Sequence, residues 1–367
     1  MPGLNNRVDV AIIGAGPAGS AAAIELARAG RQVLLIERKQ FPRDKVCGGC
    51  LSGQAVAALR RLIGAEQDLP GIVAERVTFA IGSYRLTCRP RGLTRIALRC
   101  ELDSFLANTA AAAGAEVCYG EPAALVPSET GWEVLIGDHR VRARWILLAA
   151  GLSGLPHKIG IAGRPQQRRM LAQQWTQPTQ PALPAVGHVE LQWLRGGYVG
   201  LATPTRELTV VALAAESPEF PQETAWQRLR RLNPTAPIWN ALPADAPGRY
   251  GAKGSAGFPW VSVRLGSANV LLIGDAAGYE EPFSGEGMGQ ALCSAACAAQ
   301  AVLRGADVLA DYTVLMGRYH CPSAARVRRL SRFLHSAWVH RLAEGPMLLP
   351  PGLLAHAVDW VHVRAHA

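Results

Sequence analysis

Hydrophobic positions come in short apolar runs and in alternating stretches, and both patterns predict strands interleaved with helices. An apolar run over residues 8–13 predicts a buried strand, and the alanine-rich stretch 18–29 predicts a helix that ends at Gly30. A second apolar run over residues 32–37 predicts another buried strand. Strand, helix and strand in this order predict a βαβ unit at the start of the chain.

The same mixture of strands and helices continues as far as Gly151. Helices are predicted over residues 53–63 and 102–113, and Gly114 closes the second of them. The predicted strands cover an alternating stretch at 75–98 with turns at Gly82 and Gly92, residues 115–119, a hairpin at 132–136 and 141–143, and residues 145–150.

From about Leu171 to Lys253 the composition changes, because this part of the chain is rich in proline. The elements predicted there are strands over residues 186–193, 198–202 and 208–214 and a helix over residues 224–232. They predict a second, sheet-containing domain inserted into the first. The elements predicted after it are a buried strand at 269–273, a long small-residue helix to residue 303, and a mostly helical segment from residue 311.

Composition supports a folded protein with two closely packed domains. The 367 residues exceed what one compact core usually organises, and 49% of them are hydrophobic against 18% charged. No apolar run is long enough for a membrane-spanning helix. The chain passes from Met1 into a strand without the layout of a signal peptide, so we expect a cytoplasmic protein. The scattered cysteines are typical of small apolar residues in a reducing compartment.

The formal net charge is +10, from 38 Lys and Arg against 28 Asp and Glu. This balance suits a nucleic acid, an anionic membrane surface or an anionic cofactor. Neither zinc-finger spacing nor an aromatic RNA-binding signature accompanies it, so we expect no nucleic-acid partner.

Glycines after the first predicted strand indicate a dinucleotide site. Gly14 permits a tight turn, Gly16 lets the backbone approach a pyrophosphate, and Gly19 lets the helix pack closely on the strand. Glu37 ends the second strand, where an acidic side chain is placed to bind a ribose hydroxyl. Because the string lies between a strand and a helix, the phosphates are expected at the positive helix N-terminus.

A second signature indicates which dinucleotide is bound. The apolar strand near residue 270 leads into Gly274 and Asp275, and residues 282–288 read Pro-Phe-Ser-Gly-Glu-Gly-Met. Here the sequence resembles the FAD-dependent group that includes geranylgeranyl reductases, p-hydroxybenzoate hydroxylase and flavin-dependent halogenases. The resemblance implies that Asp275 binds the ribityl chain. It also implies that the turn from Gly285 to Gly287 begins a helix directed at the pyrimidine edge of the flavin, where N–H groups stabilise the reduced anion.

Two further segments sharpen the resemblance. Residues 41–49 look like the Lys-x-Cys-Gly-Gly segment of geranylgeranyl-reductase-like proteins, which packs beside the isoalloxazine. Residues 99–106 resemble the family's Arg-x-x-Leu-Asp-x-x-Leu helix start, whose arginine contacts FAD. The resemblance implies FAD held without a covalent link. The expected cofactor-binding residues are Gly14, Gly16, Pro17, Ala18, Gly19, Glu37, Arg38, Lys45, Gly48, Arg99, Gly274, Asp275, Pro282, Gly285, Gly287 and Met288.

The implied fold is α/β: a Rossmann-like FAD-binding domain with an inserted α+β substrate domain and a helical C-terminus. The FAD-binding domain is expected to consist of two parts, residues 1–165 and residues 256–305. Within the first part, residues near 75–98 are expected to extend into the substrate domain. The substrate domain takes residues 166–255, and residues 306–367 form the C-terminal helical region. The resemblance covers the FAD segments well and the inserted region hardly at all.

Cys47 is the side chain that the resemblance places nearest the flavin ring, as the candidate catalytic residue and proton donor. With Cys50 it forms a C-x-x-C string, which is compatible with a redox dithiol, with half a zinc site, or with a flavin neighbour beside a packing residue. We favour the third interpretation over a disulfide-capable pair. No second C-x-x-C or histidine pair accompanies the string, so we expect no metal site.

Two segments depart from the family pattern. Ala150 stands where relatives often carry an aspartate in an Ala-Asp-Gly turn, which puts NADPH docking by that route in doubt. Residues 197–204 match neither the substrate strand of the reductases nor that of the halogenases, so halogenation is disfavoured. Tyr198 and Trp193 are the aromatic residues expected nearest a substrate pocket, and each suits a core position equally well.

The C-terminal segment combines arginine with apolar and aromatic residues. Arg326, Arg328, Arg329, Arg332 and Arg341 lie among residues that include Phe333 and Trp338, and no acidic residue stands between them. Such a pattern suits an interfacial helix on an anionic membrane. It also suits an amphipathic helix that packs on its own protein, the interpretation that we favour.

We expect an FAD-dependent oxidoreductase acting on a hydrophobic small molecule of the isoprenoid, polyketide or lipid class. The preferred chemistry is hydride transfer at flavin N5, which reduces or forms a C=C bond. The alternative is an FAD monooxygenase that hydroxylates an aromatic or lipid-like substrate through a flavin hydroperoxide. A flavoprotein without enzymatic activity is disfavoured because the chain keeps a full inserted domain. The external reductant or acceptor, NAD(P)H among the candidates, stays open.

Overall fold

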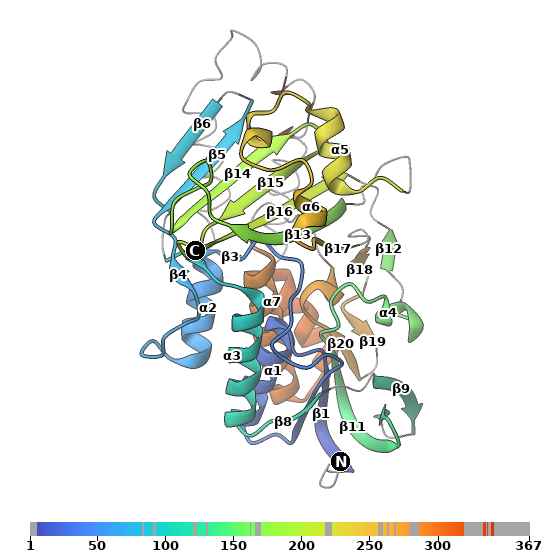
Figure 1. Ribbon diagram of the computed structural model, residues 1–367. Helices are drawn as coiled ribbons and strands as arrows, with labels where there is room; N and C mark the ends of the chain where they lie inside the picture. The colour runs from blue at the N-terminus through green and yellow to red at the C-terminus, as the bar shows by residue number, and fades with distance from the viewer. Residues whose placement is uncertain are drawn as a thin grey trace.

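The computed structural model describes residues 6–82, 84–90, 93–119, 123–129, 131–161, 163–165, 170–216, 222–255, 260–262, 264–267, 269–278, 286–318, 333–334, 336 and 339–340. These residues form two sheet-based bodies, one above the other in Figure 1. Chain segments from both halves of the sequence contribute to each body. The predicted α/β class is confirmed.

The lower body is built on an open sheet of eight strands. Its main order is β19 (Gly266–Ser267), β20 (Val270–Leu272), β11 (His139–Leu148), β1 (Arg7–Ile13), β2 (Val33–Glu37) and β8 (Glu116–Tyr119). The five strands from β20 to β8 run parallel. β10 (Gly131–Ile136) pairs antiparallel with the first half of β11, and β9 (Ala123–Ser128) extends this edge.

Small side chains let helices pack closely on one face of this sheet. The elements that share this core are α1 (Pro17–Arg28), α2 (Gly53–Ile63), α3 (Arg99–Ala112), α7 (Gly287–Arg304) and the helical residues 308–318. Along β1, Val10 and Ile12 point into this core, whereas Ala11 and Ile13 point to the other face. Where both faces are covered, along β2 and β20 and at the carboxyl ends of β1 and β11, the strands are apolar and buried. The buried Tyr312 hydroxyl donates to the Leu272 carbonyl over 2.6 Å and anchors residues 308–318.

The upper body is a seven-stranded sheet. Its order is β17 (Lys253–Ser255), β13 (Met170–Pro178), β16 (Leu208–Glu216), β15 (Gly197–Ala202), β14 (His188–Leu194), β5 (Arg76–Ile81) and β6 (Tyr84–Cys88). All neighbours are antiparallel except β14 and β5. The alternating stretch near residues 75–98 therefore contributes two strands to this sheet. Short helices α5 (Ala225–Leu232), η1 (Pro237–Asn240) and α6 (Ala246–Arg249) cover its outer face.

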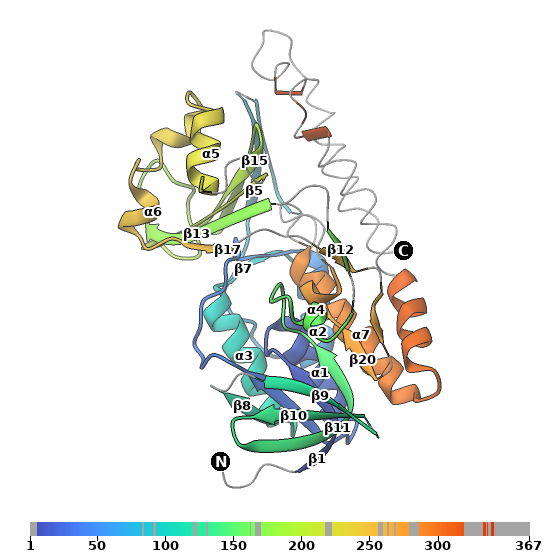
Figure 2. The ribbon, with the colours of Figure 1, turned by 90° about the vertical axis from the view of Figure 1, so that its right-hand side faces the viewer.

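Smaller elements join the two bodies. β3 (Cys50–Leu51), β7 (Arg95–Ile96) and β4 (Ile72–Val73) form a three-stranded sheet, and β12 (Gly163–Pro165) pairs with β18 (Trp260–Ser262). The remaining short helices are α4 (Leu155–Lys158) and η2 (Gly274–Ala277). Figure 2 shows the seven-stranded sheet standing over the helices of the lower body.

The described C-terminal residues pack on the inner face of the seven-stranded sheet. Leu334 and Val339 are buried in a cluster that includes Ile81 and Trp193, and Phe333 packs against the same cluster. These side chains pack inside the protein. Trp338 and the five arginines of the C-terminal segment lie outside the described residues. Within the described part of the chain, no helix is long and apolar enough to cross a membrane.

Candidate active site

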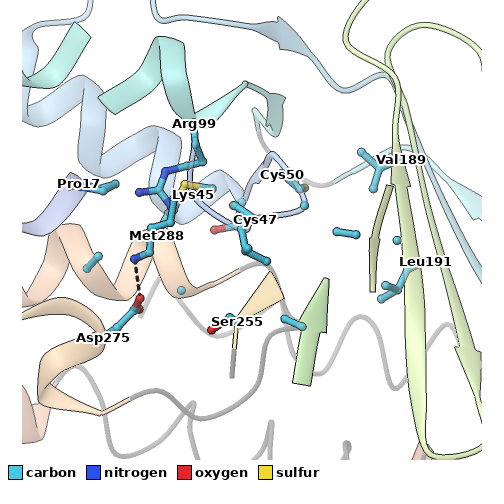
Figure 3. A pocket seen from close by; sticks show the side chains of 18 of the residues that line it. Pro17, Lys45, Cys47, Cys50, Arg99, Val189, Leu191, Ser255, Asp275 and Met288 are labelled. Atoms are coloured by element: carbon cyan, nitrogen blue, oxygen red, sulfur yellow. Dashed lines mark hydrogen bonds and ion pairs between the residues drawn. The ribbon is translucent and has the colours of Figure 1, made fainter. Parts of the chain in front are cut away.

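A large cavity lies between the two bodies. It encloses about 850 Å³ and is lined by residues of the N-terminal βαβ unit, the loop at 44–48, the turn after β20 and the inner face of the seven-stranded sheet. Figure 3 shows Pro17, Arg99 and Asp275 on one side and Val189 and Leu191 on the other. The cavity therefore has two chemically different walls.

The first wall begins with the glycine turn between β1 and α1. Gly14 has φ +104°, and an added Cβ would lie 2.5 Å from the Ala149 carbonyl oxygen. A Cβ on Gly19 would lie 1.8 Å from the Gly14 carbonyl oxygen. Gly16 differs, because its Cβ would meet only two guanidinium groups near 4 Å. Gly14 and Gly19 shape the turn, and Gly16 is the glycine that opens onto the cavity.

Four charged side chains form one buried network beside this turn. Glu37 at the end of β2 accepts from the Ala15 main-chain N–H (3.1 Å) and from the Arg43 guanidinium (2.9 Å). Arg43 also donates to the Asp103 carboxylate (3.1 Å). Asp103 accepts two bonds from Arg99, at 2.8 and 2.7 Å, and its side chain is fully buried.

The network places two guanidinium groups beside Gly16. Nη2 of Arg99 and Nη2 of Arg43 lie 3.8 and 4.0 Å from the position of a Cβ on Gly16. Burial lowers the pKa of the Arg99 guanidinium, but the Asp103 carboxylate outweighs it and leaves that pKa above its ordinary value. Two guanidiniums held over a helix N-terminus fit the pyrophosphate of a dinucleotide. Arg43 and Asp103 lie in the family-like segments 41–49 and 99–106, but they were not expected as site residues, because the sequence does not show that they meet in space.

Lys45 and Asp275 form an ion pair at the centre of the first wall, with Nζ and Oδ2 3.0 Å apart. Asp275 lies in η2, directly after β20, where the Ser294 hydroxyl accepts the Gly274 N–H. A Cβ on Gly151 would lie 3.3 Å from Nζ of Lys45, so the turn after β11 faces this pair. The parallel strands β11 and β20 thus bring their carboxyl ends to the same point, as doubly wound sheets do at a ligand site.

Other expected cofactor residues also meet at this wall. Arg38, Gly48, Gly274, Gly287, Met288, Pro17 and Ala18 all line the cavity. Pro282 and Gly285 lie outside the described residues. Glu37 and Arg43 lie behind the cavity lining, and Arg43 connects Glu37 to Gly16, which does line the cavity.

Cys47 and Cys50 line the cavity between its two walls, and both are half-buried. Burial, reinforced by Cys47, raises the pKa of the Cys50 thiol to about 12. Within the described residues, no group of three or more His, Cys, Asp or Glu is arranged to hold a metal ion.

The second wall is apolar. The side chains that strand alternation turns toward the cavity come from β5, β6 and β14, and they are Val77, Phe79, Leu86, Val189 and Leu191. Tyr198 of β15 also lines the cavity, as expected. Trp193 does not: it is 2% exposed, packs in the cluster with Leu334 and Val339, and stacks on Phe79 with ring centroids 5.7 Å apart. The expectation that Trp193 lies at the pocket is corrected, because two residues beyond Leu191 on β14 the inner face is covered by the cluster that includes Leu334 and Val339.

This geometry agrees with a match to a known family. Residues 9–237 match the model of the FAD dependent oxidoreductase family, so the chain belongs to that family and uses FAD. The space at Gly16, with the guanidinium groups of Arg99 and Arg43 beside it, fits the pyrophosphate of this cofactor. The chain is thus an FAD-dependent oxidoreductase.

Among curated proteins, the menaquinone reductase of Mycolicibacterium smegmatis is 28% identical over 90% of this chain and 85% of its own length. The chloroplastic geranylgeranyl diphosphate reductase of Nicotiana tabacum is 36% identical over 32% of this chain and 26% of its own length. Both are similar to this chain and carry the name of a reductase.

Solved structures share the fold. A flavoprotein/dehydrogenase from Cytophaga hutchinsonii superposes with a TM-score of 0.76, at 19% identity, over 98% of this chain and 92% of that one. A geranylgeranyl bacteriochlorophyll reductase-like protein from Thermoplasma acidophilum gives 0.74, at 17% identity, over 98% of both chains. The expected resemblance to the geranylgeranyl reductase and halogenase group is confirmed at the level of fold, since flavin-dependent halogenases also superpose.

Proposed function

We propose that the protein reduces a C=C bond in a hydrophobic substrate that carries an isoprenoid-type chain. The observation that carries the proposal is the contrast between the cavity walls. A charged, glycine-lined wall suits FAD, and the apolar wall of β5, β6 and β14 faces it across the same cavity. An apolar wall favours a substrate with a long hydrocarbon part and excludes water from the reacting atoms.

The names of the relatives support this substrate class. Menaquinone and geranylgeranyl diphosphate differ in their head groups, but both molecules carry an isoprenoid chain. An apolar strand surface binds such a chain through contact area, at about 25 cal/mol per Å² buried. The proposal therefore concerns the chain and leaves the head group unassigned.

When bound, FAD would supply hydride-transfer chemistry to one carbon of the alkene. The protein's own residues then have three tasks. Arg43, Arg99 and Asp275 hold the cofactor, the apolar wall orients the alkene, and a proton must reach the second alkene carbon. Cys47, placed between the walls, is the proposed proton donor. Product formation would add one hydride and one proton to the alkene, and an external donor would have to supply the two electrons for each turnover.

The test is anaerobic reoxidation of the reduced holoenzyme by candidate alkenes. We expect a menaquinone or a geranylgeranyl compound to restore the oxidised flavin spectrum and, after any quinol formed has been reoxidised in air, to retain two added hydrogens by mass spectrometry. Tyr198→Ala, which alters the apolar wall, should change the rate while the flavin spectrum stays intact. A matched reaction under oxygen checks the alternative: a product that has gained an oxygen atom would identify a monooxygenase and overturn the proposal.

A further inference from the structure

The loop that carries Cys47 is held from both bodies of the protein. On the FAD side, Lys45 pairs with Asp275 at 3.0 Å. On the other side, the Cys47 main-chain N–H donates to Oε1 of Gln174 over 3.0 Å, and Asp44 pairs with Lys253. Three of the four residues from Asp44 to Cys47 therefore have a partner outside the loop.

The two partners in the upper body belong to one rung of the seven-stranded sheet. Gln174 of β13 and Lys253 of β17 are direct cross-strand neighbours in the antiparallel register. They hold the loop at positions three residues apart. The sheet that provides the apolar wall thus also fixes the backbone of the candidate proton donor.

The neighbouring glutamine on β13 shows that this contact is specific to one face. Oε1 of Gln173 accepts the main-chain N–H of Trp226 over 2.8 Å, on the side covered by α5. Adjacent strand residues point to opposite faces, so Gln174 is the one turned toward the cavity loop. The chain therefore offers two glutamines with the same type of bond and different targets.

We propose that Gln174, supported by Lys253, is a positioning residue that sets where the Cys47 thiol lies relative to the flavin. This inference rests on the proposed function for the role of Cys47. A bond to the main-chain N–H fixes the backbone from which the thiol projects, without occupying the thiol itself. The exposed Asp44–Lys253 pair adds less, because water screens it.

The position of Cys47 can be measured without any substrate. In the FAD-bound protein, the rate of alkylation at Cys47 is followed by mass spectrometry of its peptide in the parent, Gln174→Met and Gln174→Glu. Met is close to Gln in size but is only a weak acceptor, whereas the Glu carboxylate can still accept the N–H. We expect Gln174→Met to speed alkylation about two- to tenfold, the scale of one lost hydrogen bond, and Gln174→Glu not to speed it, because its carboxylate still accepts the N–H and also disfavours the thiolate.

Gln173→Met is the matched control, because it removes a main-chain bond of the same kind on the opposite face. It should lower thermal stability and leave the alkylation rate at Cys47 unchanged. Lys253→Met should change that rate less than Gln174→Met does. An unchanged rate in Gln174→Met, or an equal change in Gln173→Met, would overturn the positioning role.

Turnover separates this inference from the proposed function. If the parent reduces an isoprenoid alkene, Gln174→Met should lower kcat and leave KM nearly unchanged, since the apolar wall is intact. If the parent reduces no such substrate, the proposed function fails, and the alkylation rates still decide whether Gln174 positions Cys47.

Discussion

The two walls of the cavity are made by different means. On the FAD wall, three glycines and four charged residues meet around one turn, and nearly every contact involves a main-chain group or an ion pair. The apolar wall has side chains projecting from strands that pair across distant parts of the chain. The first wall tolerates little change because its groups depend on one another. The second can change residue by residue, since each side chain contributes mainly contact area.

The largest predicted effect compares one glycine from each wall. In Gly19→Ala, the new methyl group would lie 1.8 Å from the Gly14 carbonyl oxygen, which forces α1 away from β1. In Gly200→Ala, the methyl group would lie 3.6 Å from its nearest neighbour, an ordinary contact. We expect Gly19→Ala to lose FAD and at least about 3 kcal/mol of unfolding free energy, at the upper end of overpacking costs.

Gly200→Ala should keep FAD and its unfolding free energy and change only the rate with substrate. Flavin content after gel filtration and denaturant unfolding measure both variants. If Gly200→Ala loses as much flavin as Gly19→Ala, the two walls do not differ in their tolerance of an added methyl group.

The same contrast explains how much the sequence could predict. The residues of the glycine turn, Glu37 and Asp275 were found because each motif is local: a strand, a turn and a helix supply its meaning within a few residues. Arg43 and Asp103 were missed, although they complete the same site. They are 60 residues apart in the chain and meet only through the packing of α3 beside the turn.

The apolar wall was predicted less well for a related reason. Strand β13 was missed because its sequence, Met-Leu-Ala-Gln-Gln-Trp-Thr-Gln-Pro, does not alternate regularly between apolar and polar residues. The glutamines interrupt the pattern expected of a strand with one buried and one solvent-exposed face. Two of those glutamines bond to other parts of the protein. The predicted strands 141–143 and 145–150 form one strand, β11, whose first half is exposed on one face and whose last residues are buried on both.

The next effect in size concerns charge pairs on the two sides. Glu37→Ala and Asp275→Ala remove carboxylates from the FAD wall, and each should weaken FAD binding about ten- to a hundredfold, as expected for a charge-assisted hydrogen bond. Glu190 pairs with Arg85 at 2.6 Å on the seven-stranded sheet. Glu190→Gln is the matched control and should leave the FAD dissociation constant unchanged.

Fluorescence titration of the apoprotein with FAD gives these constants. Far-UV circular dichroism confirms that each apoprotein remains folded. Parent-like binding by both Glu37→Ala and Asp275→Ala would show that the charged wall does not hold the cofactor.

The smallest effect is expected where the walls meet, at Cys50 on β3. Burial, reinforced by Cys47, raises the pKa of this thiol from 9.0 to about 12. The thiolate is the form that reacts with an alkylating reagent. As the pH is raised, the alkylation rate at Cys50 in the folded protein should therefore still be rising at values where the rate in the urea-unfolded chain has levelled off. Between those two pKa values the unfolded chain has released the proton and the folded one retains it.

Rising pH in this window therefore favours unfolding, and the contribution of Cys50 to stability falls from pH 9.0 towards about 12. Cys50→Ala should flatten this part of the stability profile, measured by urea unfolding at a series of pH values. The Cys50 rate, measured by mass spectrometry of its peptide, should be lower in the folded protein at every pH within the window. Equal rates in the folded and unfolded chain would mean that the thiol faces water, and that the two walls do not close around it.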